Sequence, residues 1–328
     1  MAYLAIPEFM NVLVVGINGF IGSAIASSAL SKGHKLFGLS RSTMPLLEPD
    51  VTYIAGDRQG SGLVSELITQ YDIDILVDVI AMTLKDTQPL LKSVNGMIKQ
   101  YVLISSIDVY RNYELFQGNA IGRPETENLD EDSELRKSRF PYRQNVPRAP
   151  ESVDSYLDDY DKIPTELAAQ KMSSPWTILR LPMVYGPGDR QHRFRWAIKP
   201  MATGAQEILL PKAWMDWQST YGYIQNVGEA VALTLGNTKA YNSIFNIGEQ
   251  RPTNHGEWAK RIANVVGWEG SIKYGEDPNS LLAKGIAHLD LSVPIKISSN
   301  RIRRGLGFRE IVDQDESLKD TINAEMDD

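Results

Sequence analysis

The chain of 328 residues contains no cysteine and only four histidines. Without cysteine there are no disulfides, thiolate metal ligands or thiol nucleophiles, and with so few histidines we predict no metal site. No apolar run reaches the ~20 residues of a membrane helix, and the amino terminus lacks the basic-then-apolar order of a signal peptide. With a net charge of −7, the chain lacks the positive electrostatic field of a general nucleic-acid binder. We therefore expect a soluble, cytoplasmic protein, with neither nucleic acid nor a membrane as its partner.

Residues 1–9 precede a second methionine, Met10, and we expect them to be a leader added for expression, outside the fold. From there to residue 186, short apolar runs alternate with helical stretches, which predicts an α/β fold with a doubly wound, Rossmann-like parallel sheet. Most runs are apolar at nearly every position, as is typical of central strands. The six predicted strands are Asn11–Val15, Lys35–Leu39, Thr52–Ala55, Ile75–Ile80, Tyr101–Ile104 and Thr177–Leu181.

Two segments depart from this alternation. Residues 112–155 are rich in proline and charge, which predicts a long insertion, either a lid over the substrate or a mobile loop. Residues 187–328 mix aromatic, glycine and proline residues before helices near 227–235 and 255–266. We expect them to form mainly a smaller carboxy-terminal substrate lobe, with 221–248 returning to the dinucleotide-binding domain of 10–186.

The first strand runs into a glycine-rich turn and then a helix. In this order the first glycine permits a tight turn, the second lets the backbone approach a pyrophosphate, and the third lets helix and strand pack closely. The alternative is a turn that merely uses glycines. The residues that we predict to contact a dinucleotide here are Gly16, Asn18, Gly19, Phe20, Ile21 and Gly22.

The spacing Gly-x-x-Gly-x-x-Gly resembles the short-chain dehydrogenase/reductase superfamily, and Gly19-Phe20-Ile21-Gly22 resembles its extended branch of epimerases and dehydratases. Later segments resemble further motifs of that branch, and they are Val102–Tyr110, Leu179–Gly188, Tyr221–Ala230, Phe245–Gly248 and Ile302–Phe308. The resemblance covers Met10 to Phe308. It implies a nicotinamide cofactor and a homodimer formed through the helices near Asp86–Lys99 and Leu157–Met172.

The second strand ends in Ser40-Arg41-Ser42, where NAD-selective proteins usually place a carboxylate on the adenosine ribose. A guanidinium with flanking hydroxyls suits a 2′-phosphate better, so we predict NADP rather than NAD. The alternative is a solvated surface arginine. The resemblance implies further cofactor contacts from Asp57, Arg58, Ala81, Pro182 and Val184, although Asp57 could equally be a turn residue.

The superfamily orients the substrate oxygen with a Ser or Thr, and counting back four residues from Tyr110 assigns this role to Ser106. The nucleotide-sugar dehydratases of the branch carry two adjacent acids here. This chain has Ile107 in the first place and Asp108 in the second, which weakens full dehydratase chemistry. Asp108 is therefore a candidate acid/base or substrate-binding residue, or else the cap of a local turn.

The superfamily also uses a Tyr as acid/base and a Lys four residues later that lowers the Tyr pKa. The chain has no intact Tyr-x-x-x-Lys in the expected helix. If Tyr160 is the acid/base, the Lys position falls on Pro164, and if Lys162 is the lysine, the Tyr position falls on Asp158. We favour Lys162, because the branch commonly has a Glu four residues after this lysine and Glu166 stands there.

On a continuous helix Tyr160 would point roughly 160° away from Lys162, at ~100° per residue. This departure argues against ordinary alcohol dehydrogenation. Asp158 could itself serve as a base paired with Lys162, or it could be a solvated carboxylate at a helix start.

The substrate lobe begins with a basic run after the sixth predicted strand. Arg190, His192 and Arg193 could bind a phosphate, diphosphate or carboxylate, or form a salt-bridged surface turn. Trp214 could stack on a sugar or base, or pack between the lobes. Together these features predict an NADP-dependent oxidoreductase or epimerase that acts on a nucleotide sugar or another polar, anionic metabolite. The alternative is a catalytically impaired cofactor-binding sensor, scaffold or RNA-binding protein on the same fold.

Overall fold

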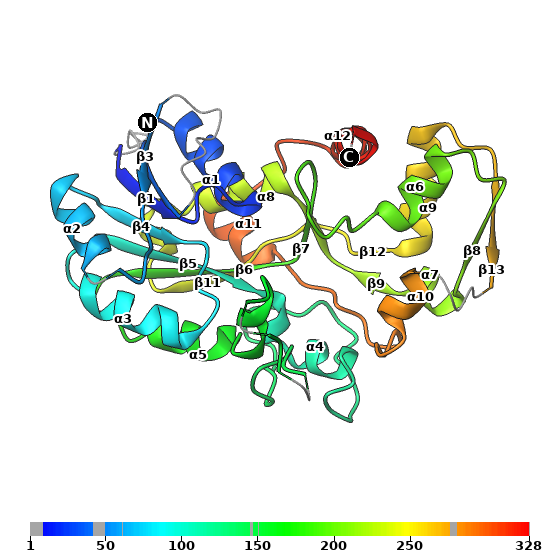
Figure 1. Ribbon diagram of the computed structural model, residues 1–328, viewed down its shortest axis with the longest axis horizontal. Coiled ribbons are helices and arrows are strands. Elements are labelled where there is room, and N and C mark those ends of the chain that lie inside the picture. Colours follow the sequence, from blue (N-terminus) through cyan, green and yellow to red (C-terminus); the bar gives the residue numbers. More distant parts are fainter. Residues whose placement is uncertain are drawn as a thin grey trace.

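The computed structural model describes residues 9–41, 50–60, 62–144, 147–149, 151–275 and 281–327. Its centre is a seven-stranded sheet in the order β11-β6-β5-β4-β1-β2-β3, in which all neighbours run parallel (Figure 1). The strands are β1 (Asn11–Val15), β2 (Lys35–Ser40), β3 (Val51–Ala55), β4 (Ile75–Asp78), β5 (Gln100–Ser106), β6 (Trp176–Leu181) and β11 (Ser243–Asn246). The predicted α/β, Rossmann-like fold is confirmed. The sheet has seven strands rather than six, because β11 has only two apolar residues and gave no strand signal.

Helices cover both faces of the sheet (Figure 1). On one face lie α1 (Phe20–Ser31) and α8 (Ile224–Ala232), and on the other α2 (Leu63–Gln70), α3 (Leu84–Val94) and α5 (Lys162–Ala169). The side chains of β1 explain why both faces must be covered. Val12 and Val14 belong to the core beneath α1, whereas Leu13 and Val15 belong to the core beneath α2 and α3. A strand that is apolar at successive positions is buried on both faces.

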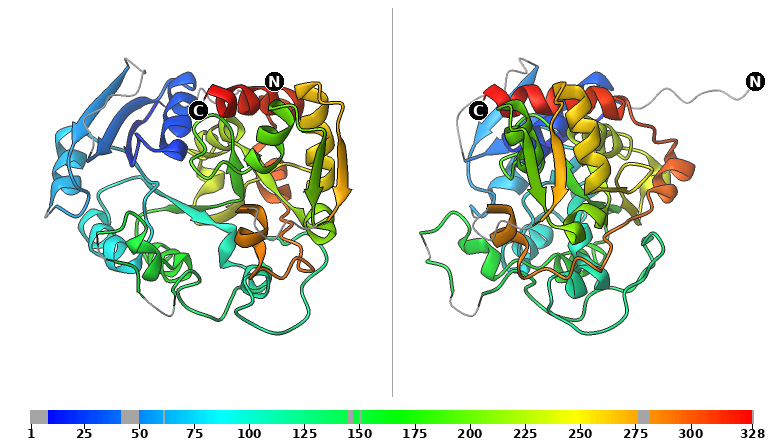
Figure 2. Two further views of the ribbon diagram at one scale, coloured as in Figure 1. Left: turned by 45° about the vertical axis from the view of Figure 1, so that its right-hand side comes forward. Right: turned by 90° about the vertical axis from the view of Figure 1, so that its right-hand side faces the viewer.

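A smaller carboxy-terminal lobe stands beside the sheet (Figures 1 and 2). Its core includes the buried Trp258, which packs against Tyr185, Phe194 and Tyr221.

The remaining elements of the protein, in either lobe, are α4 (Arg111–Phe116), β7 (Met183–Tyr185), α6 (Arg195–Ala202), β8 (Glu207–Leu210), α7 (Lys212–Asp216), β9 (Gln218–Ser219), β10 (Tyr221–Tyr223), β12 (Thr253–Asn254), α9 (His255–Val266), β13 (Ser271–Tyr274), α10 (Leu281–Ile286), α11 (Asn300–Leu306), α12 (Gln314–Asp327) and the 3-10 turns η1 (Ile107–Val109), η2 (Ser155–Asp158) and η3 (Thr238–Ala240).

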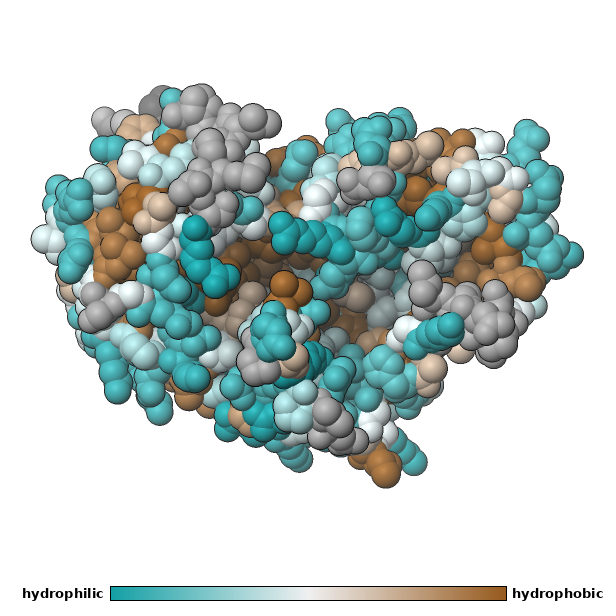
Figure 3. All heavy atoms as spheres, in the orientation of Figure 1, coloured by the Kyte–Doolittle hydropathy of each residue, from teal (hydrophilic) through white to brown (hydrophobic). Residues whose placement is uncertain are grey.

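The surface is hollowed between the sheet and this lobe, and apolar side chains are visible at the bottom of the hollow (Figure 3). The carboxyl ends of the parallel strands face a crevice of this kind in open α/β folds. Within the ranges given above, no helix combines the length and the apolar character that crossing a membrane would require.

Candidate active site

The glycine turn joins β1 to α1. Gly16 has a φ of +88°, which disfavours any residue with a side chain. A Cβ on Gly22 would lie 2.2 Å from the Gly16 carbonyl oxygen, so the helix can approach the strand only without one. Gly19 is the N-cap of α1, and the first turn of the helix carries no acidic side chain. The turn therefore presents the positive end of a helix dipole at the sheet edge.

The residues predicted to contact the adenosine end lie after β2 and β3. Arg41 is exposed directly after β2, and Ser40 is partly buried, while Ser42 lies outside the described residues. Asp57 is exposed, and its Oδ1 accepts a hydrogen bond from the Gln59 amide at 2.9 Å. The Arg58 guanidinium instead points inward.

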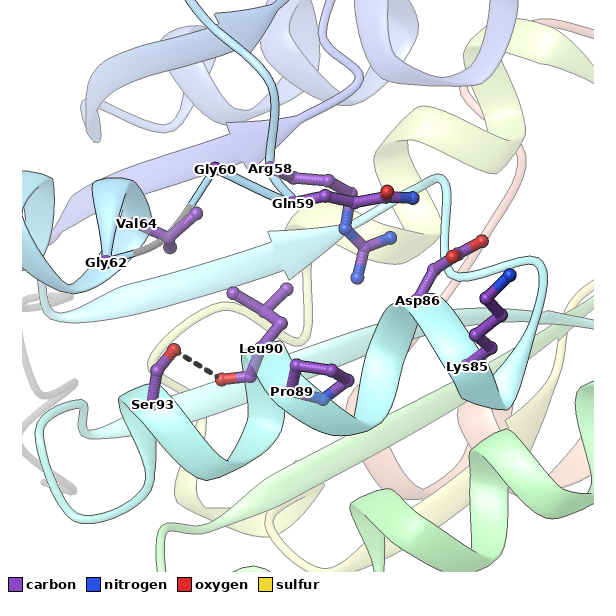
Figure 4. A pocket seen from close by; sticks show the side chains of 10 residues that line it. All are labelled: Arg58, Gln59, Gly60, Gly62, Val64, Lys85, Asp86, Pro89, Leu90 and Ser93. Carbon is purple, nitrogen blue, oxygen red and sulfur yellow. Dashed lines mark hydrogen bonds between the residues drawn. The ribbon is translucent and has the colours of Figure 1, made fainter.

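Arg58 is buried, and its Nη2 donates to Asp78 Oδ2 at 2.5 Å. The Tyr101 hydroxyl donates to the same carboxylate oxygen at 3.0 Å. A pocket of about 420 Å³ opens beside Arg58, between the loop after β3 and helix α3 (Figure 4). Its lining residues are Arg58, Gln59, Gly60, Gly62 and Val64 on one side and Lys85, Asp86, Pro89, Leu90 and Ser93 on the other.

Two neighbouring serines end β5 and have different partners. Ser106 is partly exposed, and its Oγ accepts from the Asp108 amide at 3.2 Å, which starts the turn η1. Ser105 is buried, and its Oγ donates to Glu166 Oε1 at 2.5 Å. Ser106 therefore lies at the crevice, whereas the Ser105 side chain points into the protein interior.

Ser105 belongs to a buried set of motif residues, which we call the motif network. Arg180 donates to both oxygens of Glu166, from Nε at 3.1 Å and from Nη2 at 2.8 Å. Arg180 Nη1 also donates to the Tyr110 hydroxyl at 3.0 Å, and Tyr110 donates to Asn246 Oδ1 at 2.6 Å. The network (Ser105, Tyr110, Glu166, Arg180 and Asn246) ties β5, β6, α5 and β11 together.

Lys162 is buried at the first position of α5, where its Nζ donates to two backbone carbonyl oxygens, those of Ala81 and Ile104, each at 2.9 Å. Burial lowers the pKa of Lys162 to about 8, although the charge of Asp108 opposes the shift. The ammonium group therefore lies where the carboxyl ends of β4 and β5 meet the crevice. Pro182 and Val184 are both buried, at and just after the end of β6.

The helical phase expected for Tyr160 is wrong, because α5 begins only at Lys162. Pro164 explains the boundary: an earlier start would bring its ring against the carbonyl of residue 160, whereas proline is tolerated in a first turn. Asp161 has an extended backbone, and Tyr160 precedes the helix altogether. The Lys162 Nζ lies 5.7 Å from the centre of the Tyr160 ring. Both side chains are therefore buried in the same site.

The proposed pairing of Asp158 with Lys162 is also wrong. Asp158 lies at the end of η2, where it accepts from the Arg148 amide at 2.7 Å and forms an ion pair with the Arg148 guanidinium. The hydrogen bond from the Arg148 amide is the main cause that lowers the pKa of Asp158. Because the helix starts four residues later than Asp158, the expected spacing of one helical turn does not apply.

Asp108 is the centre of a group that we call the acid cluster (Asp108, Tyr113, Tyr142 and Tyr160). Asp108 and Tyr160 are buried, and Tyr113 and Tyr142 are partly exposed. Asp108 Oδ2 accepts from the Tyr160 hydroxyl at 2.7 Å and from the Tyr142 hydroxyl at 3.0 Å. Burial raises the pKa of Asp108, and the bond from Tyr160 opposes this. Burial and the charge of Asp108 raise the pKa of Tyr160 well above its usual value. A carboxyl group and a phenol joined by a hydrogen bond in a buried site can act as an acid/base pair.

The insertion packs against this site. Its Arg136 and Arg139 both form ion pairs with the buried Asp161, the residue between Tyr160 and Lys162. Arg136 Nε also donates to the Asp108 carbonyl oxygen at 3.1 Å. The described part of the insertion therefore builds one wall of the site, and no alternation of apolar residues in its sequence signals this.

The basic run of the substrate lobe is divided between two surroundings. Arg190 is exposed, and His192 Nδ1 lies 2.9 Å from Glu325 Oε1 of α12. Arg193 is partly buried, and its charge lowers the pKa values of Tyr113 and Tyr221 against the larger effect of their burial. Arg193 is thus the arginine of this run that lies near the acid cluster.

Trp214 lies in an aromatic core of the smaller lobe. Its ring stacks on Trp217 at 5.8 Å between centroids and lies 3.9 Å from His255. Only about a tenth of the residue is exposed, at 9%. Trp214 therefore packs, but within the smaller lobe and not between the two lobes as expected.

Sequence reasoning missed four residues that contact Asp108 or its neighbours in this site. These residues are Tyr113, Arg136, Tyr142 and Asp161. Three of them lie in the insertion, and Asp161 follows it. For Asp161 the sequence did contain a signal, because Pro164 places the start of α5 after that residue.

Among proteins of known function, the chain is similar to the "Chloroplast stem-loop binding protein of 41 kDa b, chloroplastic" of Arabidopsis thaliana. The two are 22% identical over 338 residues, which cover 98% of this chain and 81% of the plant protein. This identity is low but extends over nearly the whole chain.

Two solved structures show the same fold. A putative epimerase from Burkholderia cenocepacia superposes with a TM-score of 0.70 at 17% identity, covering 98% of this chain and all of the other. The UDP-glucuronic acid 4-epimerase of Bacillus cereus, solved with NAD, superposes with a TM-score of 0.68 at 17% identity, covering 97% and 99%. A family model matches residues 12–248, which span β1, the glycine turn, the motif network and the acid cluster. The chain therefore belongs to the NAD dependent epimerase/dehydratase family.

Proposed function

We propose that the chain is an NADP-dependent oxidoreductase or epimerase that acts on a nucleotide sugar or another polar, anionic metabolite. The observation that carries the proposal is the hydrogen bond of 2.7 Å between Tyr160 and Asp108, in one buried site with Lys162 and next to Ser106. This site restores a phenol, a lysine and a serine at the crevice although the usual Tyr-x-x-x-Lys is absent.

The glycine turn fits the pyrophosphate of a dinucleotide. A Cβ on Gly22 would fill the space between helix and strand, and the first turn of α1 has no acidic side chain to repel an anion. When bound, a nicotinamide would supply or accept the hydride. The Ser106 hydroxyl would orient the substrate oxygen, and Tyr160 would give it a proton or take one from it. The Lys162 ammonium would hold the ribose hydroxyls beside the carbonyls of Ala81 and Ile104.

The choice of NADP is supported by Arg41, which is exposed directly after β2, where a cation suits a 2′-phosphate. The family description and the neighbour solved with NAD make NAD the competing cofactor. Titration with NADPH and NADH separates the two, and clearly tighter NADH binding would contradict our choice.

The substrate class is supported by Arg193, which lies near the acid cluster, and by the nucleotide sugar named for the Bacillus cereus neighbour. Arginine binds phosphate and carboxylate groups with paired hydrogen bonds. A homodimer through α3 and α5 is part of the same proposal, because the two helices pack together and Leu167 on α5 is 52% exposed.

A second candidate function is binding of a nucleic-acid stem-loop or another regulatory role. The observation that favours it is the stem-loop binding for which the plant relative is named, since the similarity to that protein covers 98% of this chain. The broken Tyr-x-x-x-Lys fits such a role as well, since binding needs no acid/base pair.

The test is the oxidation of NADPH by the full chain in the presence of a panel of nucleotide sugars and polar ketones. We expect turnover that Ser106→Ala and Lys162→Ala lower about 10²-fold or more. Ser133→Ala, at a partly exposed serine of the insertion that belongs to neither the acid cluster nor the motif network, is the control that should keep full activity. Two results together would overturn the proposal in favour of the second function. They are NADPH binding without turnover across the panel, and slower electrophoretic migration of a stem-loop RNA in the presence of the chain.

A further inference from the structure

Two phenols donate to one oxygen of a buried carboxylate in this protein. Asp108 is 2% exposed, and its Oδ2 accepts from Tyr160 at 2.7 Å and from Tyr142 at 3.0 Å. Its other oxygen, Oδ1, is buried and has no hydrogen-bond partner among the described residues. The two tyrosine rings lie 5.2 Å apart, so the carboxylate oxygen lies between two packed phenols.

Tyr142 leads from this carboxylate toward the surface. Its hydroxyl lies 3.0 Å from the Tyr113 hydroxyl, and Gln117 Nε2 donates to the Tyr113 hydroxyl at 3.2 Å. Each phenol has one proton to donate. The Tyr142 hydroxyl has donor geometry toward both Asp108 and Tyr113, and one proton serves only one of them at a time. While that proton is directed at Asp108, the Tyr113 hydroxyl, which accepts from Gln117, is the donor left for Tyr142. Tyr113 and Gln117 are both partly exposed.

The insertion holds Tyr142 in place through charged contacts around the site. Arg136 and Arg139 both pair with Asp161, and the backbone amides of residues 137 and 138 donate to the Glu114 carboxylate at 3.2 and 2.7 Å. The pair between Arg136 and Asp161 is buried on both sides, and breaking such a pair leaves an unpaired buried charge. The Tyr142 hydroxyl is therefore directed at Asp108 by the architecture of the insertion.

We propose that Tyr142 is a positioning residue of the reaction, which links Asp108 through Tyr113 to solvent and lets Tyr160 recover its proton. The inference rests on the proposed function. As hydride adds to the carbonyl carbon of the substrate, the Tyr160 O–H bond breaks and the substrate oxygen gains that proton.

The proton on Tyr160 is then replaced in steps that each break one O–H bond and form another. Asp108 Oδ2 takes the Tyr142 proton and passes it to Tyr160. Tyr142 takes the proton of Tyr113, and Tyr113 takes one from a water molecule, which leaves as hydroxide into the solvent. The sum is one solvent proton delivered to the substrate, and every side chain returns to its first state.

The experiment is a pH titration of Asp108 in the full chain without ligands, followed by ¹³C NMR of labelled aspartate carboxyls. Asp108→Asn assigns the signal. A hydrogen bond to the ionised form lowers a carboxyl pKa, so Tyr142→Phe should raise the Asp108 midpoint by about one pH unit. Tyr113→Phe should raise it less, because Tyr113 acts through Tyr142. Arg136 and Lys162, the charged groups that act on Asp108, remain in every variant.

Tyr156→Phe is the matched control, because this tyrosine is 42% exposed and lies outside the acid cluster. It should leave the midpoint unchanged. An unshifted midpoint in Tyr142→Phe, at an unchanged melting temperature, would overturn the inference.

A second readout uses the substrate that the NADPH panel identifies. Tyr142→Phe should lower the rate of NADPH oxidation about tenfold or more and leave KM unchanged, because the hydroxyl acts on proton transfer rather than binding. An unchanged rate would also overturn the inference. If no member of the panel is turned over, the proposed function is contradicted instead. The titration would then still decide whether the Tyr142 hydroxyl affects the Asp108 pKa.

Discussion

The motif network and the acid cluster each contain a buried carboxylate, Glu166 and Asp108, and differ in how well that carboxylate is satisfied by hydrogen bonds. In the motif network, Glu166 receives two bonds from Arg180 and a third from Ser105. In the acid cluster, Asp108 receives two bonds on one oxygen, both from phenols, and its other oxygen has no partner in the described part of the chain.

This difference distinguishes a structural polar group from a reactive one. A buried carboxylate that is fully paired with a guanidinium contributes to the geometry of the fold. A buried carboxyl bonded only by neutral donors has a raised pKa and can exchange protons with them. The surrounding structure must hold such a group in place, and here the insertion does so.

The largest effect should come from breaking the motif network. Arg180→Leu leaves the Glu166 carboxylate buried without its cation, which should lower the free energy of unfolding by about 3–5 kcal/mol. Urea unfolding followed by circular dichroism measures the loss. Arg304→Leu, at an exposed arginine of α11, is the control and should change it by less than about 0.5 kcal/mol. Equal losses in the two variants would mean that the network does not stabilise the fold.

The charge on Lys162, which lies beside the acid cluster, should lower the free energy of unfolding of the protein at neutral pH, whereas Arg180 raises it. Burial lowers the pKa of Lys162 to about 8, against ~10.4 in an unfolded chain, so the folded state binds fewer protons between these values. The charged ammonium therefore destabilises the fold by about 3 kcal/mol below pH 8, and this penalty disappears as the pH rises toward 10.4. Lys162→Met removes this penalty but leaves two carbonyls without a donor, at about 1–3 kcal/mol each, so the prediction rests on the pH dependence and not on the net change at pH 7.

The measurement is the difference in the free energy of unfolding between Lys162→Met and the parent chain at pH 7.5 and 9.5. The sign of the pH dependence follows from the lowered pKa: the parent chain gains stability relative to the variant as the pH rises. A difference that stays constant between the two pH values would contradict a lowered Lys162 pKa in the folded state.

The motif network could be predicted from the sequence and the acid cluster only in part. Tyr110, Arg180 and Asn246 lie in or just after strands whose apolar runs or motifs are visible, and parallel strands bring their carboxyl ends to one edge. Tyr142 reaches Asp108 from a proline-rich segment 34 positions away along the chain, where no periodicity fixes its place. Its position depends on ion pairs with Asp161, which only the folded backbone reveals.

The expected direction of the Tyr160 side chain was wrong for a more local reason. A helix that is continuous through Tyr160 and Lys162 separates their side chains, although Pro164 requires a boundary near residue 161. With that boundary, the extended Asp161 turns Tyr160 and Lys162 to the same site at a spacing of two residues. A proline in the first turn was therefore a sufficient signal for the start of α5, but not for the contact with Asp108.

The smallest effect should come from Asp158, the acid that the helical spacing had brought into the site. Its carboxylate pairs with Arg148 at the end of η2, outside both polar clusters, so Asp158→Asn should change the rate of NADPH oxidation by less than about twofold. Asp108→Asn has the same shape change and should lower the rate about 10²-fold or more, because an amide cannot pass a proton between Tyr142 and Tyr160. Steady-state rates of the two variants, measured side by side with the substrate from the panel, provide the check. Equal losses in both would place Asp158 in the reaction and would remove the distinction drawn between a paired surface acid and the unpaired acid of the cluster.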